Sequence, residues 1–230
     1  MNNLILIRHG QSVWNAENKF TGWVDVDISA KGQEEAENAA RIIKNKFLEI
    51  DHVFCSSLIR AINTAKIILD NLNSSLVPEK KWQLNERHYG SLQGKNKAET
   101  SKIYGDEMVK KWRRSYDIPP PKLSNLEVEE ERNKANFSID NDHDWPASES
   151  LKNTFDRVIN FWKCEIENKF PNKNVLIVAH GNTIRSIVKY IESISDNNIV
   201  KVEISTGQPI IYEYSNSKFP KNKYFEFNDT

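Results

Sequence analysis

The chain has 230 residues, a length at which one α/β domain can bury a substantial core. Its 32 lysines and arginines balance its 32 aspartates and glutamates, so no overall field favours nucleic acid or an anionic membrane as a partner. Any anion site must therefore be local, and we expect a single domain over residues 1–230.

In the first part of the chain, the sequence predicts a strand at 4–7, a helix with an apolar face from Ala36 to Phe47 behind a Ser29 cap, a strand at 52–56, and a helix over Leu58 to Leu72 after Ser57. In the last part, it predicts a helix over Leu151 to Ile166 after Ser148, a strand at 175–179, and a helix over Ile184 to Ile191. Weaker strands are predicted at 201–205 and 209–214. Strands that alternate with helices and consist of continuous apolar runs favour a mostly parallel sheet covered on both faces. The expected fold class is therefore a three-layer α/β/α fold. Segment 78–147 breaks the alternation, and we expect it to form an insertion over the site.

The first apolar run, at 4–7, is followed at once by Arg8 and His9. It is too short for the core of a signal peptide or for a membrane span. Cys55 and Cys164 lie in apolar stretches without a CxxC pair, which favours two buried free thiols over a disulfide. These features together favour a cytoplasmic protein.

The most informative feature is a local pattern that occurs twice. LILIRHGQS at 4–12 and VLIVAHGNT at 175–183 both have four apolar residues, a variable residue, His-Gly, an amide and a hydroxyl. Ligands of mostly parallel sheets gather beyond the carboxyl ends of the strands, where both His-Gly pairs are predicted to lie. Either histidine alone could be a hydrogen-bonded structural residue, but the repetition favours a shared site for His9 and His180.

The residues around the first copy indicate an anionic ligand. Arg8 precedes His9, Gly10 would let a ligand approach the backbone, and Ser12 and Asn15 offer neutral donors. Phosphate suits a histidine among arginines best, because guanidinium groups pair bidentately with its oxygens.

Arg60 would lie in the first turn of the helix after strand 52–56, where the helix dipole also favours anions. Two histidines at a phosphate site would divide the work. A neutral imidazole can attack phosphorus, while a second, protonated one stabilises charge on the equatorial oxygens.

Six stretches carry a family resemblance in the same order along nearly the whole chain: LIRHGQSVWN at 6–15, FTGW at 20–23, SSLIRAINTA at 56–65, LNERHYGSLQGKNKAET at 84–100, KWRRSYDIPPP at 111–121 and AHGNTIRSIVKY at 179–190. With these stretches the chain resembles the 2,3-bisphosphoglycerate-dependent phosphoglycerate mutases of the histidine phosphatase superfamily. The resemblance implies a phosphoglycerate-mutase-like fold and the glycolytic and gluconeogenic interconversion of 3-phosphoglycerate and 2-phosphoglycerate through a phosphohistidine. It further implies 2,3-bisphosphoglycerate as the priming donor, small-molecule phosphoglycerates as partners and no metal, and it adds a homodimer as an expectation.

The resemblance also assigns roles to residues. It implies that His9 becomes phosphorylated and that Glu86 is the general acid and base. The groups implied to hold the transferring phosphoryl are Arg8, Arg60 and His180. The residues implied to bind or line the substrate are Arg8, Gly10, Gln11, Ser12, Asn15, Thr21, Gly22, Arg60, Glu86, Arg87, His88, Tyr89, Lys97, Arg113, Arg114, Gly181 and Asn182. Adjacent arginines such as Arg113 and Arg114 usually indicate a solvated helix face, but their WRR context favours substrate binding.

The sequence departs from the family pattern at several places. Gln11 stands where Glu is common, segment 122–147 does not follow the usual loop, and the tail after the last predicted strand is short. Water exclusion separates transfer to a hydroxyl from hydrolysis, so the closure of the site is left open by these departures. Ser12, in contrast, is the residue typical of the mutases.

Other kinds of site find less support. Asp140, Asp142 and Asp144 imitate the start of an EF-hand loop, but Trp145 and Leu151 occupy its glycine and terminal glutamate positions. The five histidines show no HExxH or Cys-His zinc spacing, so we expect no metal site. Two alternatives to a mutase remain: a phosphatase that uses the same histidines and arginines, and a non-catalytic phosphate-binding module.

Overall fold

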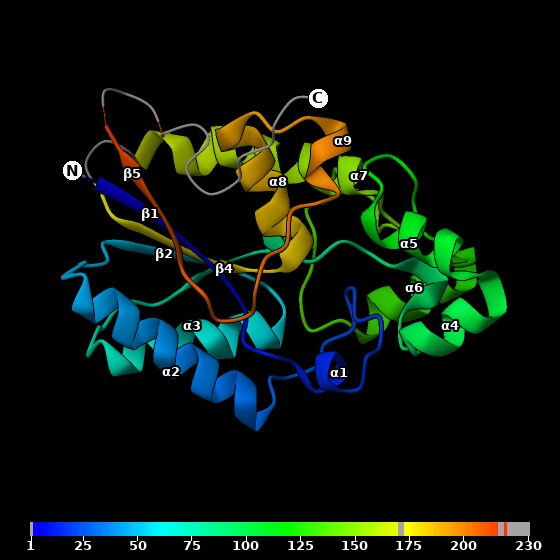
Figure 1. Cartoon of the computed structure of the whole chain (residues 1–230), viewed down its shortest axis with the longest axis horizontal. Coiled ribbons are helices and arrows are strands. Elements are labelled where there is room, and N and C mark those ends of the chain that lie inside the picture. Colours follow the sequence, from blue (N-terminus) through cyan, green and yellow to red (C-terminus); the bar gives the residue numbers. More distant parts are fainter. Residues whose placement is uncertain (1, 170–172, 216–218, 220–230) are drawn as a thin grey trace.

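The computed structural model describes residues 2–169, 173–215 and 219. Within these residues, five strands form one sheet in the order β3-β2-β4-β1-β5 (Figure 1). The strands are β1 (Asn2–Arg8), β2 (His52–Ser56), β3 (Glu79–Lys81), β4 (Val175–Ala179) and β5 (Ile210–Tyr214). The pairs among β1 to β4 are parallel and β5 is antiparallel to β1, which confirms the mostly parallel mixed sheet.

Helices cover both faces of the sheet, as Figure 1 shows, so the three-layer α/β/α fold is confirmed. On one face, α2 (Ala30–Asn45) and α3 (Ile59–Asn71) pack against alternate strand residues such as Ile5, Ile7 and Val178. On the other face, α7 (Leu151–Phe161) and α8 (Gly181–Glu192) pack against Leu4, Leu6 and Ile177. The continuous apolar strand runs are therefore explained by burial on both sides.

The remaining helices lie beyond the sheet or at its ends: α1 (Val13–Ala16), α4 (Lys97–Tyr104), α5 (Asp106–Arg114), α6 (Asn125–Lys134) and α9 (Asp196–Ile199), with short 3₁₀ turns at Trp82–Leu84, Gly90–Leu92 and Glu167–Lys169 and a π-helical turn at Trp162–Ile166. Segment 78–147 supplies α4, α5 and α6, which gather at the right of Figure 1, beyond the carboxyl end of β1. The same segment also supplies β3, a sheet strand that the sequence did not predict, because its residues are charged and largely exposed.

Several helix boundaries differ from the prediction. Phe47 lies outside α2 with a φ of 53° and is 93% exposed, so it is not part of the apolar face. Ser57 does not cap α3, which begins after Leu58 without a side-chain cap. The cap of α7 is Ser150 rather than Ser148, and its hydroxyl accepts from the backbone N–H of Asn153. The Ser29 cap of α2 is confirmed by its hydrogen bond from the N–H of Gly32.

The weak strand predicted at 201–205 is wrong. The segment is irregular, although Val202 and Ile204 are buried as an apolar alternation requires. Its backbone is held by a side chain and not by a neighbouring strand, because Arg8 Nη1 donates to the carbonyl oxygen of Ile204 at 2.7 Å. The alternation was therefore a sign of burial and not of a sheet ladder.

The two cysteines are free, as predicted, but only Cys55 is buried. Cys164 is exposed because it lies in the π-helical turn on the side facing away from Trp162 and Ile166. In the part of the chain that the structure describes, no helix combines the length and the apolar character needed to cross a membrane.

Candidate active site

The two His-Gly pairs meet because the strands that precede them are neighbours. Strand β1 pairs in parallel with β4, in a register that sets Arg8 opposite Ala179. The backbone N–H of His9 continues this pairing by donating to the carbonyl oxygen of Ala179 at 2.9 Å. The rings of His9 and His180 consequently lie edge to face, with centroids 4.9 Å apart. The predicted juxtaposition of the two histidines is thus present in the structure.

The hydrogen bond of His9 defines which of its nitrogens can react. Its Nδ1 lies 2.7 Å from the carbonyl oxygen of Gly10, an acceptor, so Nδ1 must carry the proton. In the neutral ring this leaves Nε2 with a free electron pair. Burial, followed by the positive charges of Arg60 and Arg8, holds the pKa of His9 well below its ordinary value. His9 is therefore a neutral imidazole at physiological pH, the form that a nucleophile requires.

Two arginines flank His9, of which Arg60 is buried and Arg8 is half-buried. Arg60 lies in the first turn of α3, and its guanidinium donates to the carbonyl oxygens of Gly22 at 2.6 Å and Val24 at 2.9 Å. Burial lowers the pKa of Arg60 to about 10, so it remains charged at neutral pH. Arg8 keeps its buried Nε without a hydrogen-bond partner. Because buried donors are almost always paired, this Nε–H is suited to an anionic ligand.

His180 is fully buried behind His9, at the N-cap of α8. Its Nε2 lies 2.6 Å from the hydroxyl of Ser56, the last residue of β2. Burial, and then the charges of Arg60, His9 and Arg8, lower the pKa of His180 well below its ordinary value. A bound phosphoryl group would oppose those positive charges, so anion binding is what could restore the protonated form that the sequence argument assigned to a second histidine.

Glu86 lines the same cavity and is held there by backbone donors. Its Oε1 accepts from the N–H groups of Arg87 at 2.8 Å and Asn182 at 3.2 Å. Its carbonyl oxygen accepts from the ring N–H of Trp23 at 2.5 Å and from Arg157 at 2.9 Å. The carboxyl group is thus fixed in position while one oxygen, Oε2, is left to exchange a proton with a ligand.

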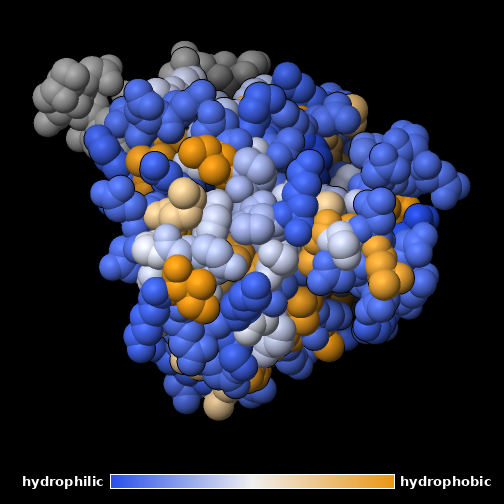
Figure 2. Space-filling view, turned by 90° about the vertical axis from the view of Figure 1, so that its right-hand side faces the viewer, coloured by the Kyte–Doolittle hydropathy of each residue, from blue (hydrophilic) through white to orange (hydrophobic). Residues whose placement is uncertain are grey.

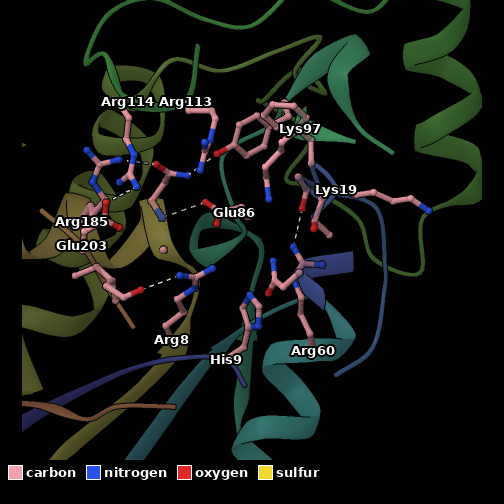
Figure 3. A pocket seen from close by; sticks show the side chains of 18 residues that line it. Arg8, His9, Lys19, Arg60, Glu86, Lys97, Arg113, Arg114, Arg185 and Glu203 are labelled. Atoms are coloured by element: carbon pink, nitrogen blue, oxygen red, sulfur yellow. Dashed lines mark hydrogen bonds and ion pairs between the residues drawn. The ribbon is translucent and has the colours of Figure 1, made fainter. Parts of the chain in front are cut away.

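The cavity has a volume of about 220 Å³, and its described lining carries seven lysines and arginines against two glutamates. In Figure 3, His9 and Arg60 lie at one end, Glu86 in the middle and Arg113, Arg114, Arg185 and Glu203 at the other end. Lys97 also lines it, with a pKa lowered by burial and then by Arg113 and Arg8, which outweigh the opposite effect of Tyr89. A local concentration of cations is present in a chain with no net charge, as expected for a site that binds a small polyanion.

Most of the sequence-derived site residues line this cavity: Arg8, His9, Asn15, Thr21, Gly22, Arg60, Glu86, Tyr89, Lys97, Arg113, Arg114, Gly181 and Asn182. Six do not: Gly10, Gln11, Ser12, Arg87, His88 and His180. Of these six, His180 lies directly against His9, and Arg87 stacks its guanidinium on the ring of Tyr89 at 4.6 Å.

Three of the remaining residues build the loop after β1. A Cβ on Gly10 would lie 2.1 Å from the carbonyl oxygen of Gly32, so this glycine admits the neighbouring backbone and not a ligand, contrary to our reasoning from the sequence. The backbone N–H of Gln11 donates to Glu35 at 2.8 Å. Ser12 caps α1 and is fully buried.

His88 lies in the interior rather than at the cavity. It is fully buried, its Nδ1 accepts from the N–H of Gly90 at 3.0 Å and its Nε2 lies 3.0 Å from Glu131. The backbone N–H of His88 donates to Glu149, which pairs with Arg157 at 2.7 Å. These contacts connect α6 and α7 to the segment that carries Glu86, so the placement of His88 favours a supporting role.

Sequence reasoning missed five residues that line the cavity: Lys19, Phe20, Arg185, Glu203 and Ile204. Arg185 could have been found, since it lies three residues after Asn182 on α8 and donates to the Asn182 side chain at 3.1 Å. Ser56, the partner of His180, stands in a quoted motif but had no assigned role. Nothing in the local sequence of Glu203 indicates its position at the cavity.

The described residues include one group of side chains with metal-ligand geometry, formed by Asp140, Asp142 and His143. All three are exposed, and Asp140 already accepts from Trp82 at 2.9 Å. The face of the molecule in Figure 2 is mostly hydrophilic, with its apolar residues in small separate groups. The cationic cavity is therefore the feature with the strongest claim to be an active site.

Comparison with known proteins decides which family this site belongs to. The profile of the histidine phosphatase superfamily (branch 1) matches residues 4–135 and 122–226. The chain belongs to the histidine phosphatase superfamily. It is 49% identical over 216 residues to the 2,3-bisphosphoglycerate-dependent phosphoglycerate mutase 2 of Lactiplantibacillus plantarum, with 93% of this chain and 94% of the relative covered. The mutase 1 of Lactobacillus johnsonii is 46% identical over 225 residues, with 97% and 98% covered. Within the histidine phosphatases, the chain therefore groups with the phosphoglycerate mutases.

Solved histidine phosphatases share the fold at lower identity. The Bacillus stearothermophilus protein YhfR is 19% identical, covers 96% of this chain and of its own, and superposes with a TM-score of 0.72. A mycobacterial glucosyl-3-phosphoglycerate phosphatase is 21% identical, covers 93% of each chain and superposes with a TM-score of 0.69. At this identity the likeness supports the fold alone.

Proposed function

We propose that the chain is a phosphoglycerate mutase that interconverts 3-phosphoglycerate and 2-phosphoglycerate through a phosphohistidine at His9. The observation that carries the proposal is the neutral, correctly oriented imidazole of His9 at one end of a cavity whose far end holds further arginines. A phosphoglycerate has anionic groups at both ends, whereas a site for phosphate alone would need cations at one end only.

Each residue has a distinct task in this reaction. The Nε2 of His9 accepts the phosphoryl group, while Nδ1–H stays on the carbonyl oxygen of Gly10. Arg8 and Arg60 neutralise charge on the phosphoryl oxygens, and His180 binds one of them once it is protonated. Glu86 gives a proton to the oxygen that leaves phosphorus and takes one from the hydroxyl that attacks it.

The cavity also fits the priming donor that the names of the relatives specify. The buried Nε atoms of Arg8 and Arg185 have no acceptor in the described protein, and a ligand with two phosphates and a carboxylate provides acceptors for both ends. When bound, 2,3-bisphosphoglycerate supplies the phosphoryl group that loads His9. Arg8, Arg60 and His9 would hold one phosphate, and Arg113, Arg114 and Arg185 would face the opposite end.

The remaining expectations belong to the same proposal. The enzyme works as one domain in which segment 78–147 covers the site, it resides in the cytoplasm, and it forms a homodimer. Size-exclusion chromatography with light scattering tests the dimer. A single peak at 26.7 kDa, the mass of one chain, would contradict it.

The deciding experiment separates a mutase from a phosphatase on the same scaffold. The enzyme receives 3-phosphoglycerate and a trace of 2,3-bisphosphoglycerate in the presence of EDTA, and 2-phosphoglycerate and inorganic phosphate are quantified. We expect 2-phosphoglycerate to predominate, and we expect the rate to rise with added bisphosphate and to be unaffected by EDTA, since guanidinium groups neutralise the phosphoryl charge. Predominant inorganic phosphate would support the phosphatase instead, and the absence of both products would support a binding module.

A further inference from the structure

An ion pair lies at the end of the cavity away from His9. Arg114, the last residue of α5, binds the carboxylate of Glu203, which follows α9 in the chain. Both residues line the cavity, and the side chain of Glu203 is 71% exposed. Figure 3 shows Arg114, Arg185 and Glu203 gathered on one side of the cavity. One of the arginines that line the cavity is thus already paired with a carboxylate of the protein itself.

Glu203 is held at this place by the backbone around it. Arg8 donates to the carbonyl oxygen of the next residue, Ile204, at 2.7 Å. The N–H of Gly207 donates to the carbonyl oxygen of Arg8 at 2.9 Å. Val202 is buried on the preceding side of Glu203. The segment that presents the carboxylate is therefore fixed to the same arginine that flanks His9.

The neighbouring arginines are engaged differently. Arg185 donates to Asn182 at 3.1 Å and to the carbonyl oxygen of Ile199 at 2.5 Å, both of which are neutral acceptors. Arg8 and Arg60 likewise donate to carbonyl oxygens. Among the cavity arginines, Arg114 is the one for which the described structure shows a negatively charged partner other than a ligand. An incoming anion must compete with Glu203 for it.

We propose that Glu203 is a specificity-determining residue. Its carboxylate competes with the ligand for Arg114, and a ligand displaces it only if the ligand carries an anionic group at its end away from His9. The inference rests on the proposed function, because it takes phosphoglycerate as the ligand that spans the cavity. A ligand with one anionic group, such as inorganic phosphate, binds between Arg8 and Arg60 and leaves the ion pair intact. A ligand with a second anionic group replaces the carboxylate of Glu203 as the partner of Arg114.

This exchange predicts that neutralising Glu203 raises the affinity for 3-phosphoglycerate and leaves the affinity for inorganic phosphate unchanged. In Glu203→Gln, binding of 3-phosphoglycerate should tighten about twofold to fivefold, the strength of a partly exposed ion pair, while binding of inorganic phosphate stays within error. Calorimetric titration of the unphosphorylated enzyme without a bisphosphate donor measures both. Asp156→Asn is the matched control, since it removes one exposed carboxylate that pairs with Lys152 at 2.8 Å outside the cavity.

A second background distinguishes competition for Arg114 from a general change of charge. In Arg114→Ala, adding Glu203→Gln should leave the affinity for 3-phosphoglycerate unchanged, because the contested partner is gone. Equal tightening of both ligands, a gain of the same size in Asp156→Asn, or no gain in Glu203→Gln would each overturn the inference and leave the mutase proposal intact. If the wild-type enzyme failed to bind 3-phosphoglycerate, both proposals would be overturned.

Discussion

At the scale of single residues, the chemistry depends on the protonation of two touching histidines. The carbonyl oxygen of Gly10 assigns the proton of His9 to Nδ1, and burial together with the charges of Arg60 and Arg8 keeps both rings neutral before a ligand binds. A charged His9 could not attack phosphorus. The arginines therefore serve twice, because they neutralise the ligand and also keep the nucleophile unprotonated.

The lowered pKa values of His9 and His180 predict a loss of stability in acid. Above about pH 6.5 both histidines are neutral in the folded and unfolded chains and make no contribution. Below it, the unfolded chain binds protons that the folded chain refuses, so the free energy of unfolding falls by up to about 1.4 kcal/mol per pH unit for each histidine. Urea unfolding between pH 7.5 and 5.5, in buffer without phosphate, measures this slope.

Two variants test the origin of that slope. His9→Asn and His180→Asn should each reduce it by about one proton. An identical slope in His9→Asn and the wild type would show that the acid sensitivity arises elsewhere, for example at His52, whose pKa is lowered chiefly by burial.

Glu86→Gln tests the proton transfer. Glutamine keeps an oxygen that can accept from the N–H groups of Arg87 and Asn182, so the backbone around it should not move. The loss of the exchangeable proton should lower turnover by about 10²-fold or more. Binding of 3-phosphoglycerate should be kept or improved. Steady-state kinetics with calorimetric titration separates these effects, and wild-type turnover in the variant would exclude Glu86 as the general acid and base.

At the scale of elements, the loop after β1 depends on the close contact between Gly10 and Gly32 at the start of α2. In Gly10→Ala, the new Cβ would meet a backbone oxygen, which has no room to yield, so we expect a loss of about 1–3 kcal/mol in the free energy of unfolding. Gly181→Ala is the control, because its nearest neighbour lies at 3.6 Å, an ordinary contact. Equal urea midpoints for the two variants would contradict this account of the loop.

The elements also show which parts of the site the sequence can predict. The contact between His9 and His180 was predictable, since parallel strands place their carboxyl ends at one edge of the sheet. Positions that depend on irregular backbone were not. The apolar alternation at 201–205 suggested a strand, but the segment binds Arg8 and brings Glu203 to the cavity. His88 has the sequence setting of a site residue, yet tertiary contacts with Glu131 place it in the interior.

At the scale of the whole molecule, charge is separated although the chain is neutral. Lysines and arginines from β1, the loop after α1, and helices α3, α4, α5 and α8 converge on one cavity. Acidic residues such as those of α6 lie elsewhere on the surface. This convergence could not be read from composition, because it arises from segments far apart in the sequence. The resulting cavity offers cations at both ends to a small phosphorylated ligand. A phosphatase that binds only the phosphate group of its substrate would not need cations at the second end.

The central claim is that a phosphoryl group resides on His9 and is passed to a phosphoglycerate. Its most direct test is to load the enzyme briefly with labelled 2,3-bisphosphoglycerate, remove free ligand and chase with unlabelled 3-phosphoglycerate. We expect acid-labile, base-stable label on His9, its absence in His9→Ala, and its transfer in the chase to bisphosphoglycerate and 2-phosphoglycerate. Label that persists in His9→Ala, or that leaves the wild-type enzyme as inorganic phosphate during the chase, would contradict the account.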